Sequence, residues 1–257
     1  MSKLLRANFA RIWKSKIFWF GTVFMTALGI YFPVQNYIIM QKENRVISLD
    51  SAFFMFALVM PFILAVFCGF FIGTEYSDGT MRNKFIVGGR RTAVYISNLL
   101  SCTAAGLIMS AAYAVPYLIL GVPLLGSFHS GAAGFIGILL CVTAAIEVFT
   151  AVFTLIAMLV NNKATGAVSC IIVGTLMFIS GIYGGLCIRS ALAAPERLSA
   201  VRRSLYEFLY DFLPGSQLIR LCNMNADRPL RMFLFSAVII AAAAVAGVLI
   251  FRRKDLK

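Results

Sequence analysis

Charge is scarce in this chain, and its scarcity excludes an ordinary water-soluble domain. Only 13% of the 257 residues are charged and 61% are hydrophobic, whereas about 25% of the residues of a typical soluble domain are charged. The apolar runs are continuous and too long for barrel strands, and backbone polar groups inside a bilayer must bond to one another. We therefore expect an all-α integral membrane protein with six transmembrane helices, forming a single domain over residues 1–257.

Candidate catalytic and metal-binding residues are also scarce. The one histidine, His129, lies in a short turn of glycine and serine residues, and Glu147 is the one ionisable residue well inside an apolar run. An intramembrane hydrolase would need paired carboxylates, a Ser/His pair or a metal cluster. The phosphate-binding loop G-x-x-x-x-G-K-[ST] is also missing. We therefore expect no catalytic residue, no metal site and no nucleotide-binding domain in this chain.

Six apolar runs have the length of a transmembrane helix, which is about 20 residues. They cover residues 17–39, 52–73, 94–121, 132–160, 164–188 and 232–251. The third and fourth runs exceed the bilayer thickness, so they must tilt, kink near Pro116 or extend into the interface. Small residues four apart, such as Gly69 and Gly73, suit close helix contact, most simply within one subunit.

The basic residues predict the orientation of the spans, because Lys and Arg concentrate in cytoplasmic loops. With both termini in the cytoplasm, fourteen of the 23 basic residues lie on that side and nine on the other, seven of these in one long segment where the rule has least force. We expect both termini to be cytoplasmic. The net charge of +13 then indicates anchoring to anionic membrane lipid and no binding of nucleic acid.

The first sixteen residues have the pattern of an amphipathic helix. One helical face is apolar, with Leu4 as the exception, and the opposite face is basic. The apolar face contains Leu5, Phe9, Ile12 and Trp13, and the basic face contains Lys3, Arg6, Arg11 and Lys14. The pattern predicts an interfacial helix over residues 1–16 on the cytoplasmic membrane surface. A disordered positive flank that only sets topology is the alternative.

Residues 74–93 form the cytoplasmic loop with the most mixed composition. Helix-compatible residues follow Gly73-Thr74, and the pair Gly88-Gly89 precedes the next span. The residues expected to carry its function are Glu75, Tyr76, Asp78, Gly79, Thr80, Arg82 and Lys84. We expect Glu75 and Arg82 to orient a short helix through charge-assisted hydrogen bonds to each other or to a partner. A solvated hairpin with topogenic arginines is the alternative.

Glu75, Gly79, Thr80 and Arg82, placed between one span and a basic patch before the next, resemble the coupling-helix region of type-2 ATP-binding-cassette transporter permeases. The whole plan, which ends in a basic tail over residues 251–257, resembles the same family, and within it the small bacterial permeases of peptide-antibiotic resistance and immunity exporters. The resemblance implies a multi-pass protein of the bacterial plasma membrane, dimeric with a second copy or a homologous permease. It also implies a separate ATPase that binds ATP and Mg²⁺, while this chain holds no cofactor.

The longest segment outside the apolar runs covers residues 189–231. Apolar residues recur in it at helical spacing until Pro214-Gly215 ends the pattern, which predicts an amphipathic external helix. The resemblance implies short helices that cap the outer mouth of the pathway; a helix resting on the outer leaflet is the alternative. Cys187 and Cys222 lie near this face, and both a disulfide and free thiols remain open.

Glu147 has two interpretations. It is a candidate pathway residue that contacts a cationic substrate group or couples protons, or it is a hydrogen-bonded glutamate that joins helices. One intramembrane acid and no evident repeat disfavour a secondary transporter. The function expected is the permease subunit of an ATP-driven exporter of a hydrophobic or amphipathic compound such as a peptide antibiotic. A non-transporting immunity or sensor protein remains open, and association with an ATPase would separate the two.

Overall fold

The computed structural model describes residues 1–44, 46–126, 131–193, 200–224 and 228–254. Within these ranges the chain forms eleven helices and no strand. Six of them are long and apolar enough to cross a bilayer. They are α2 (Lys16–Glu43), α4 (Phe56–Ser77), α6 (Arg91–Leu125), α7 (Gly131–Leu159), α8 (Lys163–Ala193) and α11 (Pro229–Arg253). The predicted all-α membrane fold is therefore confirmed.

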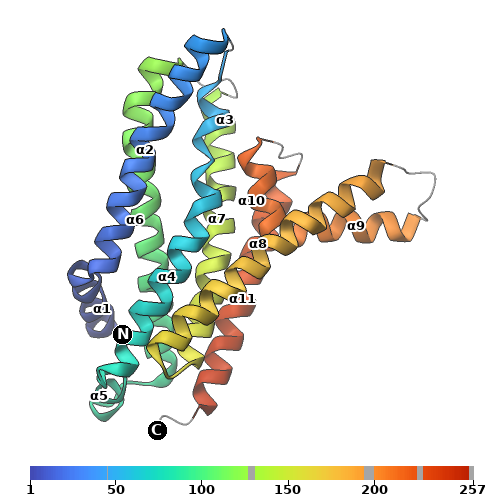
Figure 1. Cartoon of the computed structure of the whole chain (residues 1–257). Helices are drawn as coiled ribbons and strands as arrows, with labels where there is room; N and C mark the ends of the chain where they lie inside the picture. The colour runs from blue at the N-terminus through green and yellow to red at the C-terminus, as the bar shows by residue number, and fades with distance from the viewer. Residues whose placement is uncertain (45, 127–130, 194–199, 225–227, 255–257) are drawn as a thin grey trace.

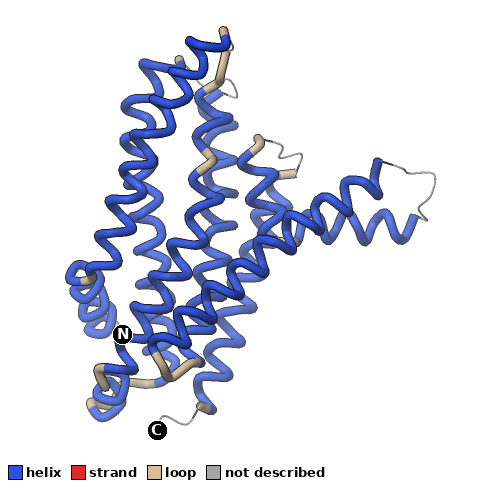
Figure 2. Tube along the Cα trace, in the orientation of Figure 1, coloured by secondary structure: helices blue, strands red, loops and turns tan. Residues whose placement is uncertain are grey.

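The long helices form one bundle (Figures 1 and 2). α2 packs along α6, α4 packs against both α7 and α8, and α11 packs against α7. The α2–α6 contact is close because α2 has a glycine there: a Cβ atom on Gly29 would lie 2.4 Å from the carbonyl oxygen of Tyr113. α6 has 35 residues and continues through Pro116. At 1.5 Å per residue it is about 52 Å long, well beyond the roughly 30 Å hydrocarbon core.

The shorter helices lie at the ends and side of the bundle. α1 (Ser2–Lys14) and α5 (Thr80–Ile86) lie at the end that also holds both chain termini, which we call the basal end (Figure 1). α3 (Leu49–Phe53) lies at the opposite end, and α9 (Ala200–Phe212) and α10 (Pro214–Cys222) follow the part of α8 that leans away from the bundle. Local signals explain several boundaries: Ser15 caps α2 by accepting a hydrogen bond from the amide of Phe18, and prolines begin α10 and α11.

The structure divides the second apolar run, residues 52–73. α3 ends at Phe53 and a new helix begins at Phe56. Phe53 and Phe54 are fully buried, and the rings of both pack against Phe135 at the start of α7. α4 then continues past Gly73 to Ser77, so that Glu75 and Tyr76 belong to a transmembrane helix and not to the loop that follows it.

α10 is an unexpected part of the core, since hydropathy alone did not mark it as buried. Gln217 and Leu218 are fully buried, and α10 packs against α7 and α8. Two glycines permit this approach: a Cβ atom on Gly181 of α8 would lie 2.4 Å from the backbone of Gly215. A buried ion pair joins Arg220 to Asp211 of α9 at 2.6 Å, so charged residues of this segment take part in helix packing. Cys222 is a buried free thiol, while the side chain of Cys187 lies outside the described residues.

Candidate functional site

A buried acid, Glu75, organises the basal end of the bundle. Glu75 lies near the end of α4 and is 1% exposed. Its carboxylate forms ion pairs with Arg11 of α1 and Lys84 of α5. It also accepts a hydrogen bond from Nδ2 of Asn98 in α6 at 3.0 Å. A single carboxylate therefore joins four helices.

Amide side chains extend this network between α1 and α6. Nδ2 of Asn8, on the buried face of α1, donates to Oδ1 of Asn98 at 2.7 Å and to the hydroxyl of Ser97 at 3.1 Å. Oδ1 of Asn8 accepts from Nζ of Lys84 at 3.0 Å. Because Asn8, Ser97 and Asn98 are all buried and all bonded, the network fixes how α1 sits on α6.

The charges of the network do not cancel. Arg11 and Lys84 share the one carboxylate of Glu75, and the guanidinium of Arg11 also donates to the carbonyl of Phe71 at 2.7 Å and stacks on its ring. Burial lowers the pKa of Arg11 to about 10. Burial, and then the neighbouring Arg11 charge, lower the pKa of Lys84 to about 7. The carboxylate is thus needed to hold two cations in a partly buried place.

A second contact joins the last transmembrane helix to the same end. Nζ of Lys254 donates to the carbonyl of Met158 at 2.8 Å and to the hydroxyl of Tyr76 at 3.2 Å. That hydroxyl donates in turn to the carbonyl of Met158 at 2.6 Å. The guanidinium of Arg91 donates to the carbonyl of Arg252 at 3.0 Å. The ends of α4, α7 and α11 and the start of α6 are therefore held together around Tyr76.

α5 presents three different faces. Met81 is buried and Phe85 packs against the core. Lys84, with Asn83, faces a cavity below α1. Arg82 and Ile86, one turn apart, are both exposed, and Ile86 is 81% exposed. The outer surface of α5 therefore carries one basic and one apolar side chain.

The structure alters the role expected of the loop residues. Glu75 forms ion pairs with Arg11 and Lys84, and its burial prevents direct contact with a partner in this arrangement. Asp78 is exposed, and Gly79 has a left-handed φ of 68° that lets the chain turn from α4 into α5. The hydroxyl of Thr80 donates to the carbonyl of Glu75 at 3.2 Å. The loop residues predicted from the sequence therefore fall into two groups. Some are buried and join helices to one another, and the others are exposed on the surface.

The N-terminal residues form the expected helix, and most of its apolar residues face the bundle. Ile12 is buried and Leu4 packs against the core, so Leu4, the exception to the amphipathic pattern, faces the bundle. Trp13 is 53% exposed, Arg6 is exposed and Phe9 is partly buried. The polar residues that sequence reasoning missed, namely Asn8, Ser97 and Asn98, had one signal: each interrupts an otherwise apolar helix face.

Glu147 lies within α7 and away from the basal end. Its Oε2 atom is buried with no hydrogen-bond partner among the described atoms. A Cβ atom on Gly106 of α6 would lie 3.0 Å from Oε1, so the carboxyl group fills a notch between these helices. The position between α6 and α7 allows the hydrogen-bonded helix contact that is one of the two interpretations of Glu147.

Comparison with known families identifies the chain. A model described as ABC-2 family transporter protein matches residues 4–181. The match covers the network around Glu75, α5 and the first four long helices, and it ends within α8. A search of curated proteins finds no match, so the assignment rests on this family model together with the six apolar helices. The chain belongs to the ABC-2 family of transporter proteins.

Proposed function

We propose that the chain is the permease subunit of an ATP-driven exporter, and that a separate ABC ATPase drives it by pressing on α5. The observation that carries the proposal is the connection of α5: its outer face is exposed, whereas its inner face is joined through Lys84 to Glu75 and through Glu75 to α1 and α6. Force applied to Arg82 and Ile86 would therefore reach several helices at once instead of bending a free loop.

The remaining features of the proposal follow from the family and the sequence. The protein lies in a bacterial plasma membrane with both termini cytoplasmic, which places the basal end on the ATPase side. Two permease copies, identical or homologous, form the pathway. The cargo is a hydrophobic or amphipathic compound such as a peptide antibiotic. ATP and Mg²⁺ bind to the ATPase alone, because this chain lacks the phosphate-binding loop.

The test uses complex formation and ATP hydrolysis. The full chain is purified from its native membrane with the ABC ATPase that accompanies it, and the complex is reconstituted in nanodiscs. We expect Ile86→Asp, alone or with Arg82→Ala, to weaken ATPase binding at least tenfold, since truncating an interface hot spot costs about 2 kcal/mol or more and about 1.4 kcal/mol is tenfold. The matched control is Val46→Asp, at a still more exposed valine (94%) that lies beyond α2, away from the basal end.

Two results would contradict the proposal. Hydrolysis of ATP by the isolated chain, after contaminating ATPases are removed, would refute its assignment as a permease subunit. Equal ATPase binding by Ile86→Asp and Val46→Asp would refute the role of α5. A stable chain that binds no ABC ATPase under any condition would instead favour the non-transporting immunity or sensor function.

A further inference from the structure

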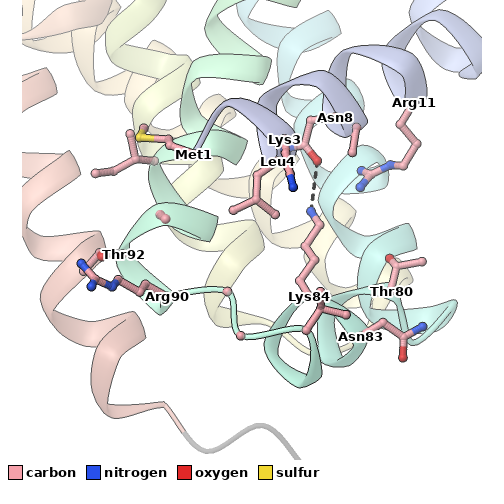
Figure 3. Close-up of a pocket in the computed structure, with 16 residues that line it drawn as sticks. Met1, Lys3, Leu4, Asn8, Arg11, Thr80, Asn83, Lys84, Arg90 and Thr92 are labelled. Atoms are coloured by element: carbon pink, nitrogen blue, oxygen red, sulfur yellow. Dashed lines mark hydrogen bonds between the residues drawn. The ribbon is translucent and has the colours of Figure 1, made fainter.

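A cavity of about 950 Å³ lies between α1, the α5 segment and the start of α6. Figure 3 shows Lys84 reaching from α5 towards Asn8 on one side of this cavity, with Arg90 and Thr92 on another. Its volume falls within the range of small-ligand pockets, about 300–1,000 Å³. Val87 at its edge is 88% exposed, so the cavity opens to the surface.

The lining of the cavity is basic on one part and apolar on another. Lys3, Arg11, Lys84 and Arg90 line it, and the described lining includes no acidic residue. Glu75, outside the lining, pairs with Arg11 and Lys84, while Lys3 and Arg90 make no described ion pair with it. The apolar lining comes mainly from α1 and α6 and includes Leu4, Ala7, Ala93 and Ile96. A ligand that fits must be anionic at one end and apolar at the other.

Aromatic residues indicate the depth of this cavity relative to a membrane. Trp13 at the end of α1 and Trp19 at the start of α2 are 53% and 46% exposed, and their rings lie 5.6 Å apart. The indole nitrogen of Trp19 donates to the carbonyl of Trp13 at 2.9 Å. Exposed tryptophans gather at the level of lipid headgroups, so α1 and the cavity that it covers lie at that level.

We propose that this cavity binds the phosphate headgroup of an anionic phospholipid, with Lys3 and Arg90 at its mouth and Arg11 and Lys84 behind. The lipid would enter from the membrane surface, and its glycerol and upper acyl carbons would pack on the apolar residues of α1 and α6. Since Lys84 and Asn83 belong to α5, the bound headgroup would stiffen the contact between the interfacial helix and α5. This site is separate from the exposed Arg82 and Ile86 surface, so it does not depend on the proposed ATPase contact.

The test measures lipid binding by native mass spectrometry of the full chain. Titration with phosphatidylglycerol is compared with titration with phosphatidylcholine for the wild type, for Lys3→Gln/Arg90→Gln, and for Arg252→Gln/Arg253→Gln. The last variant removes two exposed charges from the same end of the bundle that do not line the cavity. We expect the cavity variant to lose roughly tenfold or more in phosphatidylglycerol affinity, because each basic residue near an anionic surface contributes substantially. The control should change less than about threefold, and phosphatidylcholine binding should not change.

Further experiments distinguish the lipid from soluble phosphate and from a protein partner. Inorganic phosphate is added to the chain in neutral-lipid nanodiscs, and thermal unfolding is followed. Protection by phosphate alone that is equal to protection by phosphatidylglycerol would overturn the lipid assignment in favour of a soluble phosphate. Equal lipid affinity of the cavity variant and the control would overturn the site. Loss of ATPase binding by the cavity variant with unchanged lipid affinity would assign the cavity to the protein partner and also overturn the proposal.

Discussion

At the scale of single residues, Glu75 is the side chain on which most of the basal end depends. Replacing it by alanine leaves Arg11 and Lys84 partly buried without their shared counter-charge. Removing one partner of a buried ion pair costs about 3–5 kcal/mol, so we expect Glu75→Ala to lower the thermal unfolding temperature in detergent markedly. If Glu75 lay in a solvated loop, its replacement would be expected to affect only the coupling to the ATPase. Its buried position predicts a loss of stability instead.

The neighbouring acid Asp78 provides the control for Glu75→Ala. Asp78 is exposed, and exposed ion pairs contribute only about 0–1 kcal/mol. Asp78→Ala should therefore unfold close to the wild-type temperature. Equal unfolding temperatures for the two alanine variants would show that the Glu75 carboxylate does not hold the helices together.

Lys254 gives the basal end a pH dependence. Burial lowers its pKa from 10.5 to about 8, which means that the folded chain binds this proton less tightly than the unfolded chain. The protonated Lys254 side chain destabilises the folded state fully below about pH 8, and this destabilisation disappears as the pH rises towards 10.5. The free energy of unfolding should therefore rise between these pH values. Lys254→Met should reduce this slope. The exposed-lysine control Lys14→Met should leave the slope intact, and a slope equally steep in Lys254→Met would disprove the assignment.

At the scale of helices, α4 and α8 pack through glycines. A Cβ atom on Gly69 would lie 2.5 Å from the Cα atom of Ala167, and one on Gly73 would lie 2.7 Å from the Cα atom of Lys163. Backbone atoms cannot move aside as side chains do, so Gly69→Ala must separate the two helices. We expect a loss of about 1–3 kcal/mol, the usual cost of overpacking, measured by thermal or chemical unfolding in detergent.

Gly137 provides a control that distinguishes the effect of helix packing from that of helix propensity. A Cβ atom on Gly137 of α7 would meet nothing within 4 Å. Alanine is better than glycine in a helix by about 1 kcal/mol, so Gly137→Ala should leave stability unchanged or raise it slightly. If Gly69→Ala behaves in the same way, the α4–α8 contact is looser than the structure indicates. The structure also places the Gly69/Gly73 contact within one chain, as the simplest interpretation of the spacing predicted.

At the scale of the whole molecule, the orientation in the membrane is the feature on which the proposed function depends. Val46 lies beyond α2 and is 94% exposed, and Ser77 is exposed at the basal end of α4. With the basal end in the cytoplasm, an impermeant maleimide should label Val46→Cys in whole cells and Ser77→Cys only after permeabilisation. The wild-type chain controls for its native cysteines. Labelling of Ser77→Cys in intact cells would reverse the topology and remove α5 from reach of an ATPase.

The sequence by itself determined that most of the chain lies in lipid, how many long helices it forms and where they approximately lie. The hydrophobic effect and the need to satisfy backbone groups in lipid act on composition and run length, and both can be read directly from the chain. The pattern also predicted a helix over the first residues and a short helix after Gly73-Thr74, because amphipathic spacing and glycine breaks are local properties. The structure begins that short helix later, at Thr80.

Only the tertiary structure decided which polar residues act together. Asn8, Glu75, Lys84 and Asn98 are separated by up to 90 positions, and nothing local in the sequence indicates that one carboxylate serves Arg11 and Lys84. The burial of α10 likewise depends on glycines of two helices meeting at one point. Buried charges and close backbone contacts are stabilised by groups distant in the chain, so their partners emerge only when the helices pack.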